Sequence, residues 1–253
     1  MASALTTPLG PRPTHRAPTN AALLKAAAQA RDTGPAFRPP DTTARNAHRT
    51  NTRQEMLDAL RGQFEWMEGD LRQRNGRTVM AHDVADRGLS LRDWLMVGKA
   101  SGRGLKMDFK EAAAIQPAIA AAKRAGVADD HLIFNIAVDS GTPYFVRKIR
   151  AAFPSTLINL SVSGNSPAAI TAARQAADDA RKAERELGLP PGPIAFPMDA
   201  NGLTRQAVRR LREKGDVAVW NNPDVWSPPD IAATKRELIS WGVNGMIDLR
   251  TKH

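Results

Sequence analysis

The sequence predicts one α/β domain, a (β/α)8 TIM barrel formed by residues 44–253, preceded by a tail in residues 1–43. Eight apolar runs of strand type alternate along this domain with segments of helical pattern. Eight strands, each followed by a helix, favour a closed parallel barrel over an open sheet. The chain of 253 residues is also of ordinary length for a single barrel.

The eight predicted strands are short runs bounded by turn-forming residues. The first has the lowest apolar content. They are Ala44–Arg49, Phe64–Leu71, Gly104–Phe109, Leu132–Val138, Thr156–Val162, Ile194–Met198, Val217–Trp220 and Gly245–Leu249.

The segments between the strands have helical spacing, and capping residues mark several of their ends. Ser90 and Ser166 are suited to N-cap positions, and Pro167 to the first helical position. Gly188 supplies a stop. The predicted helices are Arg53–Leu60, Leu91–Val97, Glu111–Arg124, Pro143–Ala152, Pro167–Leu187, Thr204–Lys214 and Pro229–Trp241.

Residues 1–43 have the composition of a disordered tail, since seven prolines interrupt them. Only Asn20–Arg31 could form a short alanine-rich helix. The tail lacks the continuous apolar stretch of a cleavable signal peptide. An organelle transit peptide or a non-cleaved bacterial secretion signal are alternatives to plain disorder. We expect residues 1 to about 40 to be dispensable for folding.

The amino-acid composition limits the partners, the chemistry and the location that are expected for this protein. With 36 basic and 26 acidic side chains the net charge is +10. This charge favours anionic partners such as phosphoesters, nucleic acid or a membrane surface, or serves solubility alone. The absence of cysteine excludes disulfides, thiolate metal sites and cysteine nucleophiles. It suits a cytoplasmic protein or one exported from a bacterium. Neither a transmembrane segment nor a nucleic-acid-binding module is expected. The oligomeric state is left open.

Charged residues inside predicted strands are the main indication of function, because a buried charge needs a partner or a metal. Glu68 and Asp70 are two residues apart and so point to one face of the second strand. On the third strand Lys106, Asp108 and Lys110 share a face in the same way. Three carboxylates on neighbouring strands suit one hard divalent cation, Mg²⁺ or Ca²⁺. The alternative is a salt-bridge network among the same residues.

Two histidines lie beside this acidic cluster. His48 ends the first strand, and His82 follows a short extended segment, Thr78–Ala81. Cleavage of a phosphodiester needs a base for the attacking oxygen and an acid for the leaving one, and two imidazoles can supply both. We therefore predict catalytic roles for His48 and His82.

The order of these motifs resembles that of the glycerophosphodiester phosphodiesterase-like barrels, a superfamily that includes phospholipase D toxins. Within it, the chain is most similar to the menorin family. The superfamily motifs are His48-Arg49, Glu68-x-Asp70, His82-Asp83 and Asp108-x-Lys110. The menorin features are His48-x-x-Asn51, Met80-Ala81-His82, Leu91-x-x-Trp94 and the run from Gly104 to Lys110.

The resemblance implies a role for each of these residues. Glu68, Asp70 and Asp108 would bind the metal, and His48 and His82 would act as acid and base. The side chains assigned to substrate are Arg49, Lys106 and Lys110 around the phosphate, with Asn135 and Trp220 shaping the pocket. Thr50 stands where the glycerophosphodiesterases have glycine after His-Arg, which places their substrate specificity in question for this chain.

Two classes of function follow. The first is a divalent-metal-dependent phosphodiesterase that acts on a small or lipid-linked phosphodiester and yields either a hydrolysed or a cyclic phosphate. The alternative is a non-catalytic menorin-like protein that recognises an anionic headgroup or a partner protein. Retention of both histidines and all three carboxylates favours the enzyme.

Overall fold

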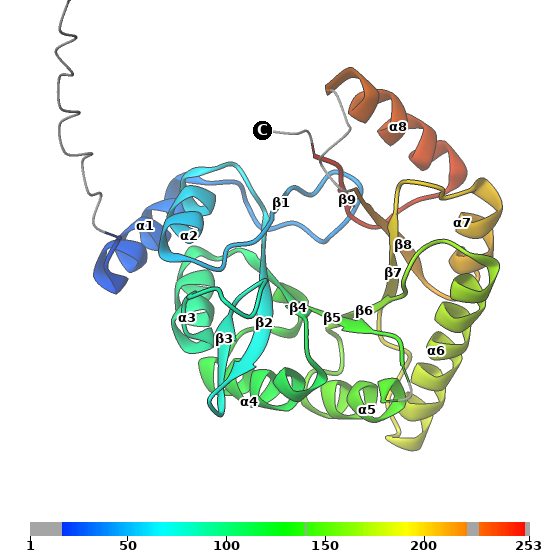
Figure 1. Ribbon diagram of the computed structural model, residues 1–253, viewed down its shortest axis with the longest axis horizontal. Coiled ribbons are helices and arrows are strands. Elements are labelled where there is room, and N and C mark those ends of the chain that lie inside the picture. Colours follow the sequence, from blue (N-terminus) through cyan, green and yellow to red (C-terminus); the bar gives the residue numbers. More distant parts are fainter. Residues whose placement is uncertain (1–16, 140, 222–227, 251–253) are drawn as a thin grey trace, which may run out of the picture.

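The computed structural model describes residues 17–139, 141–221 and 228–250, and its eight parallel strands enclose one barrel with the helices outside (Figure 1). The predicted fold class is therefore confirmed. Neighbouring strands follow one another around the barrel in chain order, except that β3 lies outside the ring. The ring strands are β1 Asn46–Ala47, β2 Trp66–Arg74, β4 Gly104–Phe109, β5 Leu132–Ala137, β6 Leu157–Ser161, β7 Ile194–Asp199, β8 Asp216–Trp220 and β9 Ile247–Asp248.

The barrel is nearly closed, and its seam lies between β1 and β9. In the described part of the chain no backbone ladder joins these two strands. Asn46 Nδ2 instead donates to Asp248 Oδ2 across the seam at 3.0 Å. The predicted first strand, Ala44–Arg49, is shorter in the structure because its flanking N–H groups donate to side chains: Arg45 to Glu65 Oε2 and Arg49 to Glu68 Oε2.

The extended segment before His82 is a strand, β3 (Arg77–Met80), that pairs antiparallel with the end of β2. Asn75 and Gly76, both with positive φ, make the turn between them. This hairpin extends above the barrel rim and delivers His82 to the mouth, where β2 and β4 end.

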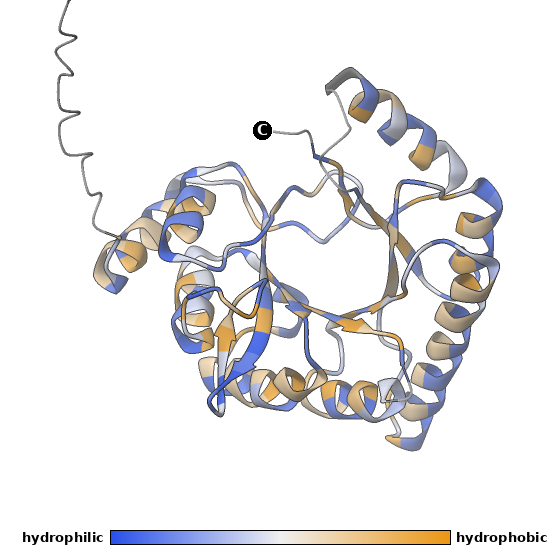
Figure 2. Ribbon diagram, viewed as in Figure 1, coloured by the Kyte–Doolittle hydropathy of each residue, from blue (hydrophilic) through white to orange (hydrophobic). Residues whose placement is uncertain are grey.

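The helices cover the outside of the sheet, as predicted, and their apolar faces point inward (Figure 2). Their N-caps include Thr52, Ser90, Ser166 and Thr204, each of which accepts a backbone N–H of its own first turn. The predicted helix Glu111–Arg124 begins as a 3₁₀ turn, Ala112–Ala114. The helices are α2 Arg53–Arg61, α3 Leu91–Ser101, α4 Ile115–Ala125, α5 Thr142–Ala152, α6 Pro167–Glu186, α7 Arg205–Arg212 and α8 Pro228–Trp241.

Residues 17–43 of the predicted tail are ordered in the structure, and the short helix that Asn20–Arg31 could form is present. Helix α1 (Asn20–Thr33) packs against α2 and α3 and buries Leu23, Ala27 and Ala30. These three residues recur at helical spacing, so they form one apolar stripe despite the surrounding prolines. The chain then continues through Phe37, whose ring stacks on His131 at 3.7 Å. Residues 1–16 of the predicted tail lie outside the described residues.

One buried ion pair ties two helices to the sheet. Arg150 on α5 and Glu184 on α6 are both essentially inaccessible to solvent, and their side chains meet at 2.7 Å. Arg150 also donates to the carbonyls of Thr156 and Pro193, which precede β6 and β7. Both charges are thus fully hydrogen-bonded, as burial requires. Among the described residues, no helix is long and apolar enough to cross a membrane.

Candidate active site

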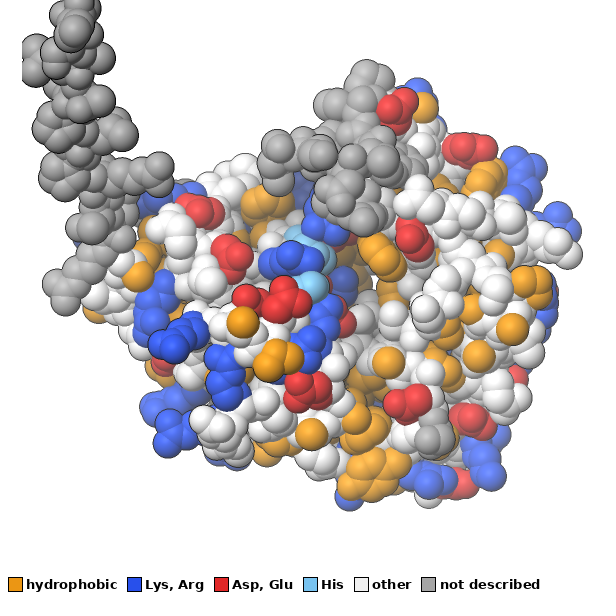
Figure 3. Space-filling view, viewed as in Figure 1, with side chains coloured by type: hydrophobic (Ala, Val, Ile, Leu, Met, Phe, Trp, Pro, Cys, Tyr) orange, Lys and Arg blue, Asp and Glu red, His pale blue; other side chains and the backbone are white. Residues whose placement is uncertain are grey.

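A cavity of about 870 Å³ opens at the carboxyl ends of the strands, the end at which TIM barrels carry their active sites. Histidine side chains lie in the middle of this face, among basic and acidic groups (Figure 3). The polar residues that line the cavity are His48, Arg49, Glu68, His82, Lys106, Asp108, Lys110, Asn135, Ser161, Asp199, Asn221, Asp248 and Arg250.

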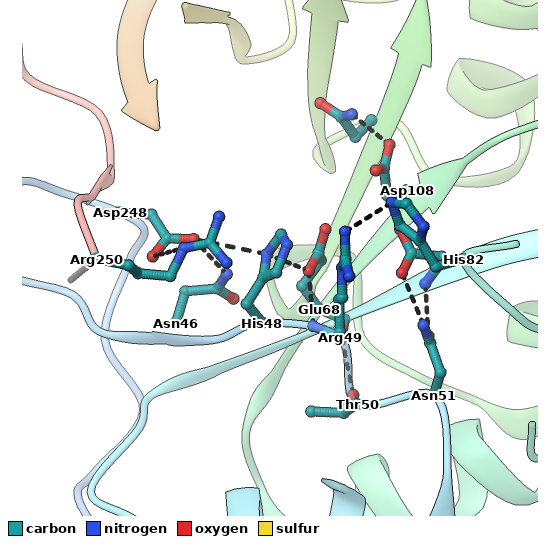
Figure 4. Close-up of polar contacts among 12 residues, drawn as sticks. Asn46, His48, Arg49, Thr50, Asn51, Glu68, His82, Asp108, Asp248 and Arg250 are labelled. Carbon is teal, nitrogen blue, oxygen red and sulfur yellow. Dashed lines mark hydrogen bonds and ion pairs between the residues drawn. The ribbon is translucent and has the colours of Figure 1, made fainter. Parts of the chain in front are cut away.

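Glu68 on β2 is the best-buried acid that lines this cavity, with 1% of its surface exposed. Its Oε2 atom lies 2.6 Å from His48 Nδ1 and accepts the backbone N–H of Arg49 at 2.9 Å (Figure 4). Burial alone raises the pKa of the Glu68 carboxyl, but the His48 contact and the charge of Lys106 hold that pKa far below its usual range. The carboxylate is therefore ionised. Its Oε1 atom accepts no hydrogen bond from the described residues.

The loop after His48 is fastened to β2 by two side chains. Thr50 is buried; its N–H and its hydroxyl both donate to the Glu68 carbonyl, and its hydroxyl accepts the indole N–H of Trp94. The Asn51 side chain makes two hydrogen bonds to Asp70. Its Nδ2 donates to Asp70 Oδ2 at 2.7 Å, and its Oδ1 accepts the Asp70 backbone N–H at 2.8 Å. Residues Thr50, Asn51 and Trp94 thus fix the loop that carries His48.

Asp108 on β4 lies beside Asp70 on β2, as the strand register requires. Its Oδ1 atom accepts Nδ2 of Asn135 at 2.6 Å, and its Oδ2 atom accepts Lys110 Nζ at 2.6 Å. Lys110 Nζ also lies 2.9 Å from Asp70 Oδ1. Burial lowers the pKa of the Lys110 ammonium, but the charges of Asp108 and Asp70 outweigh burial and raise that pKa. Lys110 is accordingly a fixed cation within the acidic cluster.

The three predicted metal ligands converge. One carboxylate oxygen from each of Glu68, Asp70 and Asp108 lies within 4.8 Å of the other two. Ionised oxygen donors of this kind suit a hard divalent cation, so the residues present fit the metal that the fold family implies. Part of the predicted salt-bridge network is present as well, because Lys110 contacts two of these carboxylates.

Arg49 follows His48 in the chain, and its side chain contacts the second histidine, His82. Arg49 has a left-handed backbone, with φ of 55°, a strained conformation for a residue that is not glycine. Its guanidinium lies 2.9 Å from His82 Nε2. A guanidinium can only donate, so Nε2 is the acceptor and the proton of a neutral His82 sits on Nδ1. That atom faces Asp83 Oδ1 at 3.2 Å.

The cavity wall brings together the side chains singled out in the sequence, with one exception. Asp70 is fully buried and lies behind Lys110 instead of lining the cavity. Trp220 lines the opposite wall and is 40% exposed. Sequence reasoning assigned no site role to Asn51, Asp248 or Arg250. Asn51 was visible within the His48-x-x-Asn51 motif, and the other two were visible as charges at the end of the last strand.

One family model matches the first half of the barrel. Residues 41–159 match the family model of the menorin N-terminal domain. This segment contains both histidines, all three carboxylates, Lys106, Lys110 and Asn135. A search of curated proteins finds no match.

Solved structures similar to this chain include glycerophosphodiesterases. A glycerophosphoryl diester phosphodiesterase from Parabacteroides distasonis aligns over 93% of this chain and 90% of its own, with a TM-score of 0.58 and 12% identity. A putative glycerophosphoryl diester phosphodiesterase from Silicibacter pomeroyi covers 88% and 94%, with a TM-score of 0.49 and 13% identity. At such identity the first similarity shows the barrel fold alone. The family match covers residues 41–159, just under half of the chain, and the structural similarity shows the TIM-barrel fold.

Proposed function

We propose that this protein is a divalent-metal-dependent phosphodiesterase that uses His48 and His82 as base and acid. The observation that carries the proposal is the convergence of three carboxylates within 4.8 Å beside an imidazole that one of them orients. The Parabacteroides protein of the same fold is a glycerophosphoryl diester phosphodiesterase by its name, which supports the class of reaction.

Glu68, Asp70 and Asp108 would hold the cation, Mg²⁺ or Ca²⁺. When bound, it would neutralise charge on the non-bridging oxygens of the phosphodiester. Lys110 and Lys106 add positive charge to the same region, and Lys106 forms no ion pair within the described part of the chain. A dianionic transition state would therefore meet cationic groups around the phosphate.

His48 is suited to accept a proton. The ionised Glu68 carboxylate, 2.6 Å from Nδ1, keeps the proton of a neutral imidazole on that nitrogen and leaves Nε2 as the basic atom. The same carboxylate stabilises the imidazolium that forms once Nε2 has taken a proton from the attacking hydroxyl. Because His48 leads into a loop fastened to β2 by Thr50 and Asn51, the ring has a fixed position.

His82 is suited to donate a proton to the leaving oxygen, and Arg49 controls when it can do so. In the structure Arg49 donates to His82 Nε2, the atom that must carry the proton. A bound phosphodiester offers the guanidinium a charged acceptor, which is a stronger partner than a neutral imidazole. Transfer of Arg49 to the phosphate would free Nε2 for protonation.

Single substitutions His48→Asn and His82→Asn test the proposal. Each should lower turnover of a phosphodiester such as bis(p-nitrophenyl) phosphate by about 10²–10⁴-fold, the usual share of a general acid or base. Turnover by the double variant should be scarcely lower than by either single variant, because both groups serve one proton relay. The matched control is His131→Asn, since His131 lies at the opposite end of the barrel against Phe37.

Turnover that survives loss of both histidines would contradict the mechanism. A wild-type protein that binds phosphodiesters in the presence of either cation but turns none of them over would favour the alternative, a menorin-like protein that recognises an anionic headgroup or a partner.

A further inference from the structure

A second cavity, of about 380 Å³, lies inside the barrel below the active site. Most of its polar side chains gather at its ends: Lys106 and Asp248 toward the mouth, and Asp41, Asp130, Ser155, Asp216 and Asn244 at the amino ends of the strands. Between these ends the lining is mainly apolar, except for Asn159, and comes from β2 and from β5 to β9.

The cavity exists because three inward positions hold small side chains. TIM barrels normally fill their interior with layers of bulky branched residues. Here β7 contributes Ala195 and Pro197, and β8 contributes Ala218. Other positions that line the hollow hold large side chains: Trp66 on β2, Ile133 on β5 and Leu157 on β6. Small residues on β7 and β8, with large ones on these other strands, leave an off-centre apolar hollow.

This hollow adjoins the active-site cavity. Lys106, Pro197, Trp220 and Asp248 line both. The separation between them is thus made of side chains, two of which are long and partly exposed: the Lys106 chain and the Trp220 ring. A molecule bound by its phosphate at the mouth would have an apolar space within reach behind that phosphate.

Asn159 provides a second, independent indication that the hollow takes a ligand. It lies on β6, lines the hollow and is 4% exposed, yet its Oδ1 atom has no hydrogen-bond partner in the described structure. A buried amide without a hydrogen-bond partner destabilises a fold, so its presence calls for an explanation, such as a ligand that supplies the missing partner. A hydroxyl or amide N–H in the polar linkage of a bound lipid would satisfy it.

We propose that the hollow binds an alkyl chain of the phosphodiester, so that the substrate is lipid-linked and its chain lies along the barrel axis. The inference rests on the proposed function for the position of the phosphate. Phe37, Pro39 and Pro40, from the segment that follows α1, close part of the far end and limit the length of chain that fits.

The test uses alkyl phosphocholines from ethyl to decyl, below their micelle concentrations, with binding to the full chain measured by calorimetry in chelator. Each methylene that enters the hollow should tighten binding about fourfold, the factor for one buried methylene, until the hollow is full. Ala218→Leu should remove the gain for the longer chains, about tenfold or more for decyl, and leave ethyl binding unchanged. Ala218→Val should have a smaller effect of the same sign.

The matched control is Ala172→Leu on the exposed face of α6, which should keep the wild-type dependence on chain length. Affinity that does not change with chain length would overturn the inference, as would a dependence that Ala218→Leu leaves intact. The proposed function fails separately. Binding that strengthens with chain length without turnover in Mg²⁺ or Ca²⁺ rejects the enzyme and keeps the chain site. Turnover of the ethyl compound, with an affinity that does not depend on chain length, rejects the chain site and keeps the enzyme.

Discussion

Replacing Asp108 by asparagine separates a metal site from a salt-bridge network. The side chain keeps its size, so the Asn135 amide retains a carbonyl acceptor, but one of the three negative charges is lost. A cation present at a hundred times its dissociation constant stabilises the native state by about 2.7 kcal/mol. For a protein of this size about 2–4 °C of melting temperature corresponds to 1 kcal/mol. The wild-type protein should therefore melt about 5–10 °C higher in saturating Mg²⁺ or Ca²⁺.

The variant should lose most of this metal-dependent shift, because the remaining ligands are two carboxylates against two nearby lysines. In chelator it should melt somewhat lower than wild type, since Lys110 loses one of its two charged partners at a cost of about 1–3 kcal/mol. Differential scanning calorimetry with and without metal measures both effects. Asp199→Asn is the control, because this carboxylate lines the same mouth outside the cluster. An equal metal-dependent shift in wild type and D108N, or none in wild type, would refute the metal site.

Three further outcomes are expected. Arg150→Met should lower the free energy of unfolding, measured in urea, by about 3–5 kcal/mol, because it leaves the Glu184 carboxylate buried without its partner. A double variant in which Arg150 and Glu184 are both replaced by apolar residues should recover much of this loss. Leu23→Ala should lower the free energy of unfolding by about 2–5 kcal/mol, because Leu23 is fully buried. A chain that starts at Asp41 should melt at a much lower temperature than one that starts at residue 17. Equal melting temperatures would mean that α1 does not stabilise the fold. Because the folded pKa of Glu68 lies below its ordinary value of 4.5, the unfolded chain takes up that proton first, so stability should fall as pH drops below about 4.5 and fall less steeply in E68Q.

The barrel was predictable because its strands and helices are marked locally. Alternation on β4 separates Met107 and Phe109 from Lys106 and Asp108, and Ser166-Pro167 gives the start of α6. The sequence allowed a short helix at Asn20–Arg31, but its docking on the barrel was not predicted, because prolines suggested disorder and its three buried residues are stabilised by packing on α2 and α3. That contact is tertiary and leaves only a weak pattern in the sequence.

The site was predictable as a set of residues but not as an arrangement. Strand periodicity places Glu68 and Asp70 on one face, yet nothing local indicates that Lys110 covers Asp70 or that Arg49 meets His82. The first contact depends on the register of β2 against β4, and the second on the hairpin β2–β3 and on the positive φ of Arg49. The hollow interior also depends on which residues of the neighbouring strands β7 and β8 point into the barrel, and that relation appears only in three dimensions.

The position of the acidic and imidazole groups along the chain has a consequence for how this barrel can diversify. Every carboxylate and histidine assigned to catalysis lies between residues 48 and 110, on β2, β4 and the loops beside them. Ala195, Pro197, Ala218 and Trp220, which shape the space beside and below the phosphate, all follow residue 190. In the proposed function, the residues that act on the phosphate and the small residues that open the hollow thus lie in separate halves of the chain. A library confined to residues 194–220 would vary the groups that a phosphate can carry into the barrel without altering any residue that acts on it.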